Sequence, residues 1–141
     1  MSYSLTATPQ PTIEFRPTTL VRTGWALTAV PALFLLFDAA VKVLRLPMTV
    51  EASAQLGYSG TTIAPLGILE IALLVLYLTP RVAPLGAVLW TAYLGGAVAT
   101  HFRVGNPLFT HMLFPTYVAA LLWAGLWLRD ARIRALLGRI R

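Results

Sequence analysis

Ionisable side chains stand inside or directly beside stretches of this 141-residue chain that are apolar enough to cross a membrane. They are Asp38, Lys42, Glu70, His101, Arg103 and His111. An ionisable group at the centre of a transmembrane helix costs about 3 kcal/mol on insertion scales, so it is expected to have a partner or a purpose. These six residues are therefore the candidates for ligand binding or acid–base chemistry.

The positions of Asp38 and Glu70 along their helices predict different partners for the two carboxyl groups. Asp38 and Lys42 are four residues apart, hence on one face of a helix and able to pair, and Arg45 continues that face. A plain ion pair within one helix is the structural alternative. Glu70 lies about nine residues from either end of its stretch, too far to reach the surface. Glu70 is therefore either neutral, because burial disfavours the charged form, or paired with a cation from another helix.

The other three candidates lie where helices should meet the membrane surface. Anchoring at that surface explains His101, Arg103 and His111 as readily as a site does. The chain has no cysteine, so thiolate nucleophiles, cysteine-ligated clusters and disulfides are excluded. The residues indicate no metal site and identify no cofactor.

Composition indicates an integral membrane protein of one domain. Apolar residues make up 57% of the chain and charged residues 11%, whereas soluble domains carry about 25% charged residues. The net charge of +6 is concentrated towards the termini. On a membrane protein, this favours contact with anionic lipid head groups, and we expect no nucleic-acid partner.

Four apolar stretches predict an all-α, four-helix transmembrane bundle, because a spanning helix needs about 20 residues. They cover residues 20–46, 61–79, 82–102 and 108–128. Asp38 and Lys42 interrupt any cleavage region, so we expect the first stretch to be a span rather than a signal peptide. Pro31 and Pro115 should kink the first and fourth helices. The predicted organisation is a flexible tail, a membrane domain and a basic tail, at residues 1–17, 18–130 and 131–141.

The C-terminal tail repeats apolar residues at helical spacing. Ile133, Leu136, Leu137 and Ile140 recur at i, i+3, i+4 and i+7 with arginines between them. This pattern predicts a short amphipathic helix lying in the membrane interface. A frayed, solvated tail is the alternative, because short helices are marginal unless adsorbed to something.

Basic residues are distributed unequally between the two sides of a four-span chain. The side holding both termini has Arg16, Arg22, Arg81, Arg129, Arg132, Arg134, Arg139 and Arg141, whereas the other has Lys42, Arg45 and Arg103. This predicts cytoplasmic termini and places all six candidates in the outer half of the membrane. Ten arginines against one lysine suggest a GC-rich bacterial genome, hence a bacterial cytoplasmic membrane.

Two runs of sequence resemble the DoxX-like family of small integral membrane proteins. The run from Pro65 to Arg81 resembles the family's second helix, a Gly-x-x-Glu pattern closed by Pro-Arg, which Gly67 and Glu70 match. The run from Tyr93 to Gly105 resembles its third helix, which ends in a His followed by a basic residue and Gly. His101, Arg103 and Gly105 match that ending, and Lys42 stands where the family tends to carry a lysine. Asp38 has no assigned place in the pattern.

The resemblance implies a four-helix membrane fold and, more loosely, a role beside quinone-linked or other redox complexes. The favoured function is a non-catalytic redox-linked subunit or binding module. Its outer-half pocket would hold a quinone-like or other small lipophilic ligand, with membrane redox proteins as partners. The alternative is a small membrane enzyme using Glu70 and His101 as acid and base on an apolar substrate. Transport is less favoured because no inverted repeat is visible.

Overall fold

A computed structural model of the protein describes residues 17–138. Residues 1–16 of the predicted N-terminal tail and residues 139–141 of the predicted C-terminal tail lie outside them. Within the described part all regular structure is helical. The elements are α1 (Pro17–Val43), α2 (Pro47–Gln55), α3 (Gly60–Leu78), α4 (Ala83–Arg103), the π-helix η1 (Leu108–Met112), α5 (Phe114–Arg129) and α6 (Ala131–Gly138).

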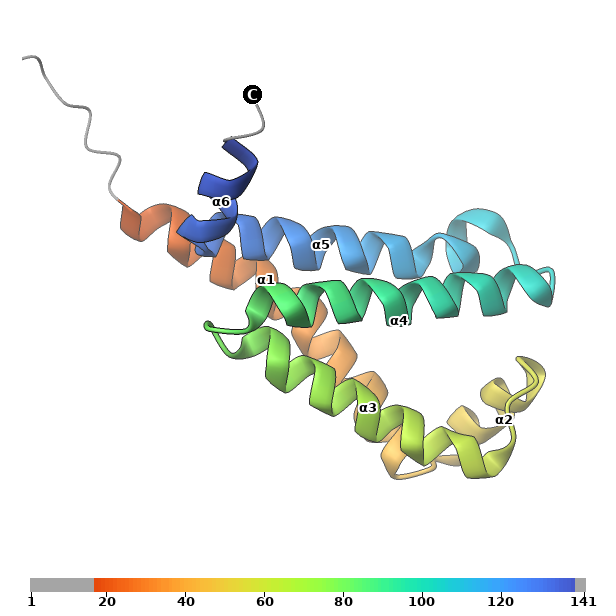
Figure 1. Ribbon diagram of the computed structural model, residues 1–141. Coiled ribbons are helices and arrows are strands. Elements are labelled where there is room, and N and C mark those ends of the chain that lie inside the picture. Colours follow the sequence, from red (N-terminus) through yellow and green to blue (C-terminus); the bar gives the residue numbers. More distant parts are fainter. Residues whose placement is uncertain (1–16, 139–141) are drawn as a thin grey trace, which may run out of the picture.

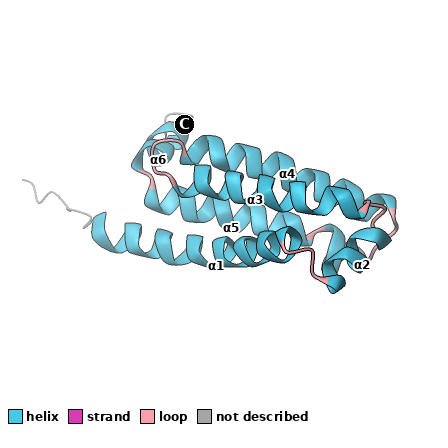
Figure 2. Cartoon of the chain, turned by 90° about the horizontal axis from the view of Figure 1, so that it is seen from below, coloured by secondary structure: helices cyan, strands magenta, loops and turns pink. Residues whose placement is uncertain are grey.

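The predicted four-helix transmembrane bundle is confirmed. Helices α1, α3, α4 and the continuous segment Leu108–Arg129 are each long and apolar enough to cross a membrane. They form a ring in which α1 and α4 each pack against both α3 and α5 (Figures 1 and 2). The start of α1, the α3–α4 turn and α6 lie at one end of the bundle, which we call the inner end (Figure 1). Helix α2 and η1 lie at the other, outer end.

The outer end contains a helix that the sequence did not predict. Helix α2 starts at Pro47, where a missing backbone N–H does no harm. Helix α4 closes with a tight turn in which Gly105 has a φ of 71°, and the N–H of Asn106 bonds the carbonyl of His101 at 3.1 Å. Gly105 therefore supplies the left-handed backbone conformation that ends the helix, in the His-basic-Gly ending that resembles the family.

Near Pro115, where a kink is predicted, the fourth span changes from π-helix to α-helix. Leu113 forms a bend between η1 and α5, and Pro115 occupies the first turn of α5 rather than a helix interior. Pro31 does lie inside α1, which continues as helix on both sides of it. The predicted short C-terminal helix is present as α6, with Ile133 buried and Leu136 exposed.

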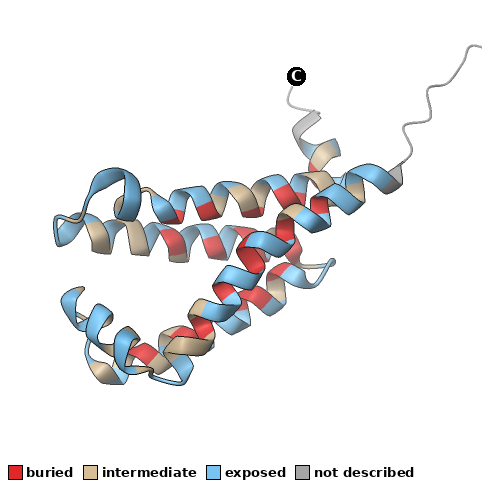
Figure 3. Ribbon diagram, turned by 180° about the vertical axis from the view of Figure 1, so that it is seen from behind, coloured by how far each residue is buried: buried red, intermediate tan, exposed pale blue. Residues whose placement is uncertain are grey.

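The bundle core is narrow, and much of its outside is apolar. Trp90, Tyr77, Leu122, Leu126 and Leu35 are at most 2% exposed. Buried positions lie on the sides of the helices that face one another (Figure 3). Many large apolar side chains point outward instead, among them Leu33, Phe37, Ile68, Val75 and Val88. This is the expected pattern where lipid covers the outside of the helices.

Glycines let the helices approach closely at three seams. A Cβ at Gly125 would lie 2.5 Å from Oγ1 of Thr28 on α1, and one at Gly67 would lie 2.7 Å from the Ala39 carbonyl oxygen. A Cβ at Gly86 would lie 2.5 Å from the Tyr77 backbone, across the α3–α4 seam. Small residues are typical of tightly packed membrane helices, where van der Waals contact drives association.

These contacts predict opposite effects of two equal substitutions on α4. Gly86→Ala should destabilise the bundle by about 1–3 kcal/mol, because the α3 backbone must move. Gly96→Ala is the matched control: its Cβ meets nothing within 4 Å. It should be neutral or stabilising by up to about 1 kcal/mol, because alanine favours helix. Thermal melts of both variants in one detergent test this, and equal melting temperatures would contradict the packing at Gly86.

Candidate functional site

Close packing of α1 on α3 sets the first part of the site. Gly67 lies against Ala39 and Lys42 of α1, so the Lys42 side chain crosses to α3 next to Glu70, which is one helical turn beyond Gly67. The Lys42 ammonium donates to Oδ2 of Asp38 at 2.6 Å and to Oε1 of Glu70. The pairing predicted for Asp38 and Lys42 is thus confirmed, and Lys42 also forms an ion pair across the helix seam.

Tyr93 of α4 completes this group, which we call the central cluster: Asp38, Lys42, Glu70 and Tyr93. The Tyr93 hydroxyl donates to the same Oε1 of Glu70 that Lys42 contacts. Glu70 itself is 0% exposed, while the side chains of Lys42 and Asp38 are 18% and 34% exposed. The cluster therefore runs from a fully buried carboxylate to a half-buried one, and it joins α1, α3 and α4.

One buried polar atom of this cluster and one of a neighbouring side chain lack partners among the described residues. They are Oε2 of Glu70, an acceptor, and Nε1 of Trp90, a donor. The Trp90 ring stands edge-on to the Tyr93 ring, with centroids 5.6 Å apart. Buried polar atoms are nearly always hydrogen-bonded, so the unpartnered Oε2 of Glu70 is a candidate contact for a bound polar group.

The histidines form a second group at the outer end. Nδ1 of His101 lies 2.8 Å from Nδ2 of Asn106, and the His101 and His111 rings stand 5.9 Å apart. His101 is eight residues beyond Tyr93, about 12 Å along the helix axis. No hydrogen bond or ion pair between described residues joins the histidines to the central cluster, and no group of three or more metal-ligating side chains occurs in the described part.

Arg103 has a different role from the other candidates. Its guanidinium donates to the Leu56 carbonyl at 2.6 Å, and the Tyr58 hydroxyl lies 2.9 Å from Oγ1 of Thr100. These two contacts fasten the segment between α2 and α3 to the end of α4. Of the six predicted residues, the structure thus brings Asp38, Lys42 and Glu70 together, pairs His101 with His111, and gives Arg103 a bridging contact.

Sequence reasoning missed Tyr93 and Trp90 as members of the site. A signal for Tyr93 was available, because it lies near the middle of its span rather than at the membrane surface where tyrosines collect. A tyrosine hydroxyl at that depth needs a hydrogen-bond partner, as a carboxylate does. Trp90 carried no comparable signal, since only the packed structure shows that its N–H is buried.

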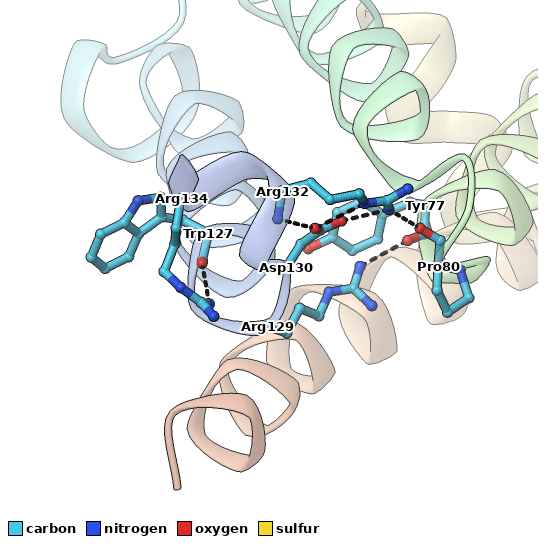
Figure 4. A network of polar contacts seen from close by, with 7 residues as sticks. All are labelled: Tyr77, Pro80, Trp127, Arg129, Asp130, Arg132 and Arg134. Carbon is cyan, nitrogen blue, oxygen red and sulfur yellow. Dashed lines mark hydrogen bonds and ion pairs between the residues drawn. The ribbon is translucent and has the colours of Figure 1, made fainter. Parts of the chain in front are cut away.

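Arginines fasten the inner end by bonding carbonyls that helix ends leave free (Figure 4). Arg129 donates to the Tyr77 carbonyl at 2.8 Å, and Arg132 donates to that of Pro80 at 2.5 Å. Arg134 donates to the carbonyls of Trp127 and Leu128. Asp130 pairs with Arg132 at 2.7 Å, and hydrogen bonds from Arg132 hold the pKa of the Asp130 carboxyl below its usual range.

A four-helix bundle with a charged cluster inside its spans defines a polytopic membrane protein with an intramembrane polar site. The sequence model of the DoxX-like family matches residues 26–125. The chain belongs to this family, as the sequences of its second and third membrane spans, α3 and α4, indicated. No curated protein and no solved structure matches it. The matched region contains the whole central cluster, and it ends before Arg129, Arg132 and Arg134.

The buried ion pair predicts that Glu70→Gln strongly lowers the stability of the bundle. This change keeps the shape of the side chain but leaves the Lys42 ammonium without its buried partner, which should cost about 3 kcal/mol. The double variant with Lys42→Met should recover much of that loss, because the charge then left unpaired in the cluster is that of Asp38, whose side chain is 34% exposed. Thermal melts in detergent measure both. A single variant that melts like the wild type would mean that Glu70 is neutral and only hydrogen-bonds.

Proposed function

We propose that this protein is a non-catalytic binding module whose central cluster holds a small lipophilic ligand with quinone-like oxygens. The observation that carries the proposal is the unpartnered Oε2 of Glu70, a fully buried acceptor in the middle of a membrane span. An intramembrane ionisable residue is by default a candidate for function. An ion pair buried for stability alone is a poor explanation, since apolar packing of the same volume often stabilises as well.

The charges of the cluster indicate what the ligand must supply. With both carboxyls ionised, Asp38 and Glu70 outweigh the single ammonium of Lys42, and the excess is negative. Oε2 of Glu70 therefore favours a donor, such as the hydroxyl of a reduced, quinol-like ring. The cluster thus suits a ligand that carries a hydroxyl.

The ligand should enter from the lipid side of α4, at the part of this helix that no other helix covers. A Cβ at Gly96, one turn beyond Tyr93 on α4, would meet nothing within 4 Å, and Tyr93 is only partly buried. We propose that a lipophilic molecule dissolved in the membrane approaches the cluster along this face of α4. The alternative enzyme gains no support, because His101 bonds Asn106 two turns away from Tyr93.

Quinol binding should depend on the Tyr93 hydroxyl. We expect a decyl-substituted benzoquinol to stabilise the purified protein more than its quinone does, because Oε2 of Glu70 accepts but cannot donate. Tyr93→Phe should weaken quinol binding about five- to tenfold, because it removes the hydrogen bond that holds the Glu70 carboxylate in place for the ligand. Titrations followed by melting temperature, under anaerobic conditions, measure both.

Tyr117→Phe is the matched control, since Tyr117 is 47% exposed on α5. It should bind quinol like the wild type. Equal affinities of Tyr93→Phe and the wild type, or no stabilisation by either probe, would contradict the proposed function.

We further propose that both termini face the cytoplasm of a bacterial cell, with membrane redox proteins as partners. The start of α1, the α3–α4 turn and α6 share the inner end, where arginines are concentrated. Reporter fusions at either terminus should be active in the cytoplasm, whereas a reporter inserted at Gly60 should be active outside. Terminal and Gly60 reporters on the same side would rule out this orientation.

A further inference from the structure

A hollow lies at the inner end, away from the central cluster. It has a volume of about 240 Å³ and is lined by residues of α1, the α3–α4 turn and the α5–α6 junction, among them Trp25, Pro80, Arg129, Asp130 and Arg132. Pockets for drug-sized ligands are typically about 300–1,000 Å³. This pocket is therefore of a size for a small group rather than a whole cofactor.

Arg129 gives the pocket an uncompensated positive charge. Its guanidinium lies 4.2 Å from the Trp25 ring centroid and 4.7 Å from that of Tyr77, so aromatic rings cover it. One nitrogen bonds the Tyr77 carbonyl, but Nε and Nη1 are buried without a partner among the described residues. No carboxylate of the described part pairs with Arg129, and a buried cation without an anion is costly.

The neighbouring charges do not cancel this excess. The Asp130 carboxylate lies in the same pocket, where it accepts hydrogen bonds from the Arg132 backbone, Nε and Nη2 (Figure 4). Because Arg132 meets that charge, the sum over Arg129, Asp130 and Arg132 is one positive charge. The side chain of Arg132 is 60% exposed, so its guanidinium can also be reached by an anion from outside the pocket.

The depth of the pocket indicates where its anion comes from. Arg129 is the last residue of the fourth span, and Pro80 follows the second, so the pocket lies at the membrane surface. We propose that it binds the phosphate group of an anionic phospholipid. Guanidinium groups are suited to phosphate recognition, and Trp25 fits the aromatic belt at head-group level. The basic helix α6 would then rest on the same lipid surface.

The test uses the full chain in neutral detergent, titrated with dioctanoyl phosphatidylglycerol and followed by native mass spectrometry and melting temperature. The lipid should bind and raise the melting temperature, and dioctanoyl phosphatidylcholine should do so less. Arg132→Gln should weaken phosphatidylglycerol binding at least about fivefold, the factor expected for one basic residue near an anionic surface. Arg132 is mostly exposed, so this variant should still fold. Arg129→Gln should weaken binding further.

Arg81→Gln is the matched control, because Arg81 is an exposed arginine of the same end that does not line the pocket. It should bind phosphatidylglycerol like the wild type. Equal losses in the Arg81 and Arg132 variants would overturn the proposal in favour of unspecific attraction to a basic surface. Inorganic phosphate that competes as well as the lipid at equal concentration would overturn the assignment to a phospholipid.

Discussion

The structure depends on supplying one buried carboxylate with hydrogen-bond and ion-pair partners in the absence of water. Glu70 lies on α3 and is fully buried, and the hydrocarbon of a membrane contains no polar group that could stabilise its charge. Its partners must therefore come from other helices. Lys42 supplies the charge from α1 and Tyr93 a hydroxyl from α4. One oxygen atom therefore ties three helices in a fixed register. Gly67 supports this arrangement, because its lack of a side chain lets α1 pack closely on α3 beside Lys42 and Glu70.

The two ends of the bundle handle polar groups in different ways. At the inner end, arginines bond the carbonyls that helix ends leave free, and they hold the α3–α4 turn against the α5–α6 junction. At the outer end, Arg103 and Tyr58 fasten the segment after α2 to α4. The polar groups at both ends lie near water and head groups, where alternative partners exist. The central cluster has no such alternative, which is why its orphaned oxygen is informative about function.

The two proposed sites differ in how far the family match covers their residues. The matched region, residues 26–125, includes every member of the central cluster. Arg129, Asp130 and Arg132 follow it, so the pocket at the inner end is a property argued for this chain alone. The two sites also differ in chemistry, since the central cluster has an unmet acceptor and the inner pocket an unmet cation. They would select different molecules from the same membrane.

The sequence by itself determined the membrane class, the four spans and the pairing of Asp38 with Lys42, because length, hydropathy and helical spacing are local properties. It also indicated that Glu70 needs a partner. Only the tertiary structure decided which partner, since Lys42, Arg103 and His101 were equally available in the sequence. The choice rests on where backbones touch: Gly67 brings α1 to Glu70, whereas His101 lies two turns beyond Tyr93. The orphaned Oε2 of Glu70 and the unpaired Arg129 likewise depend on packing between distant segments, which no local pattern records.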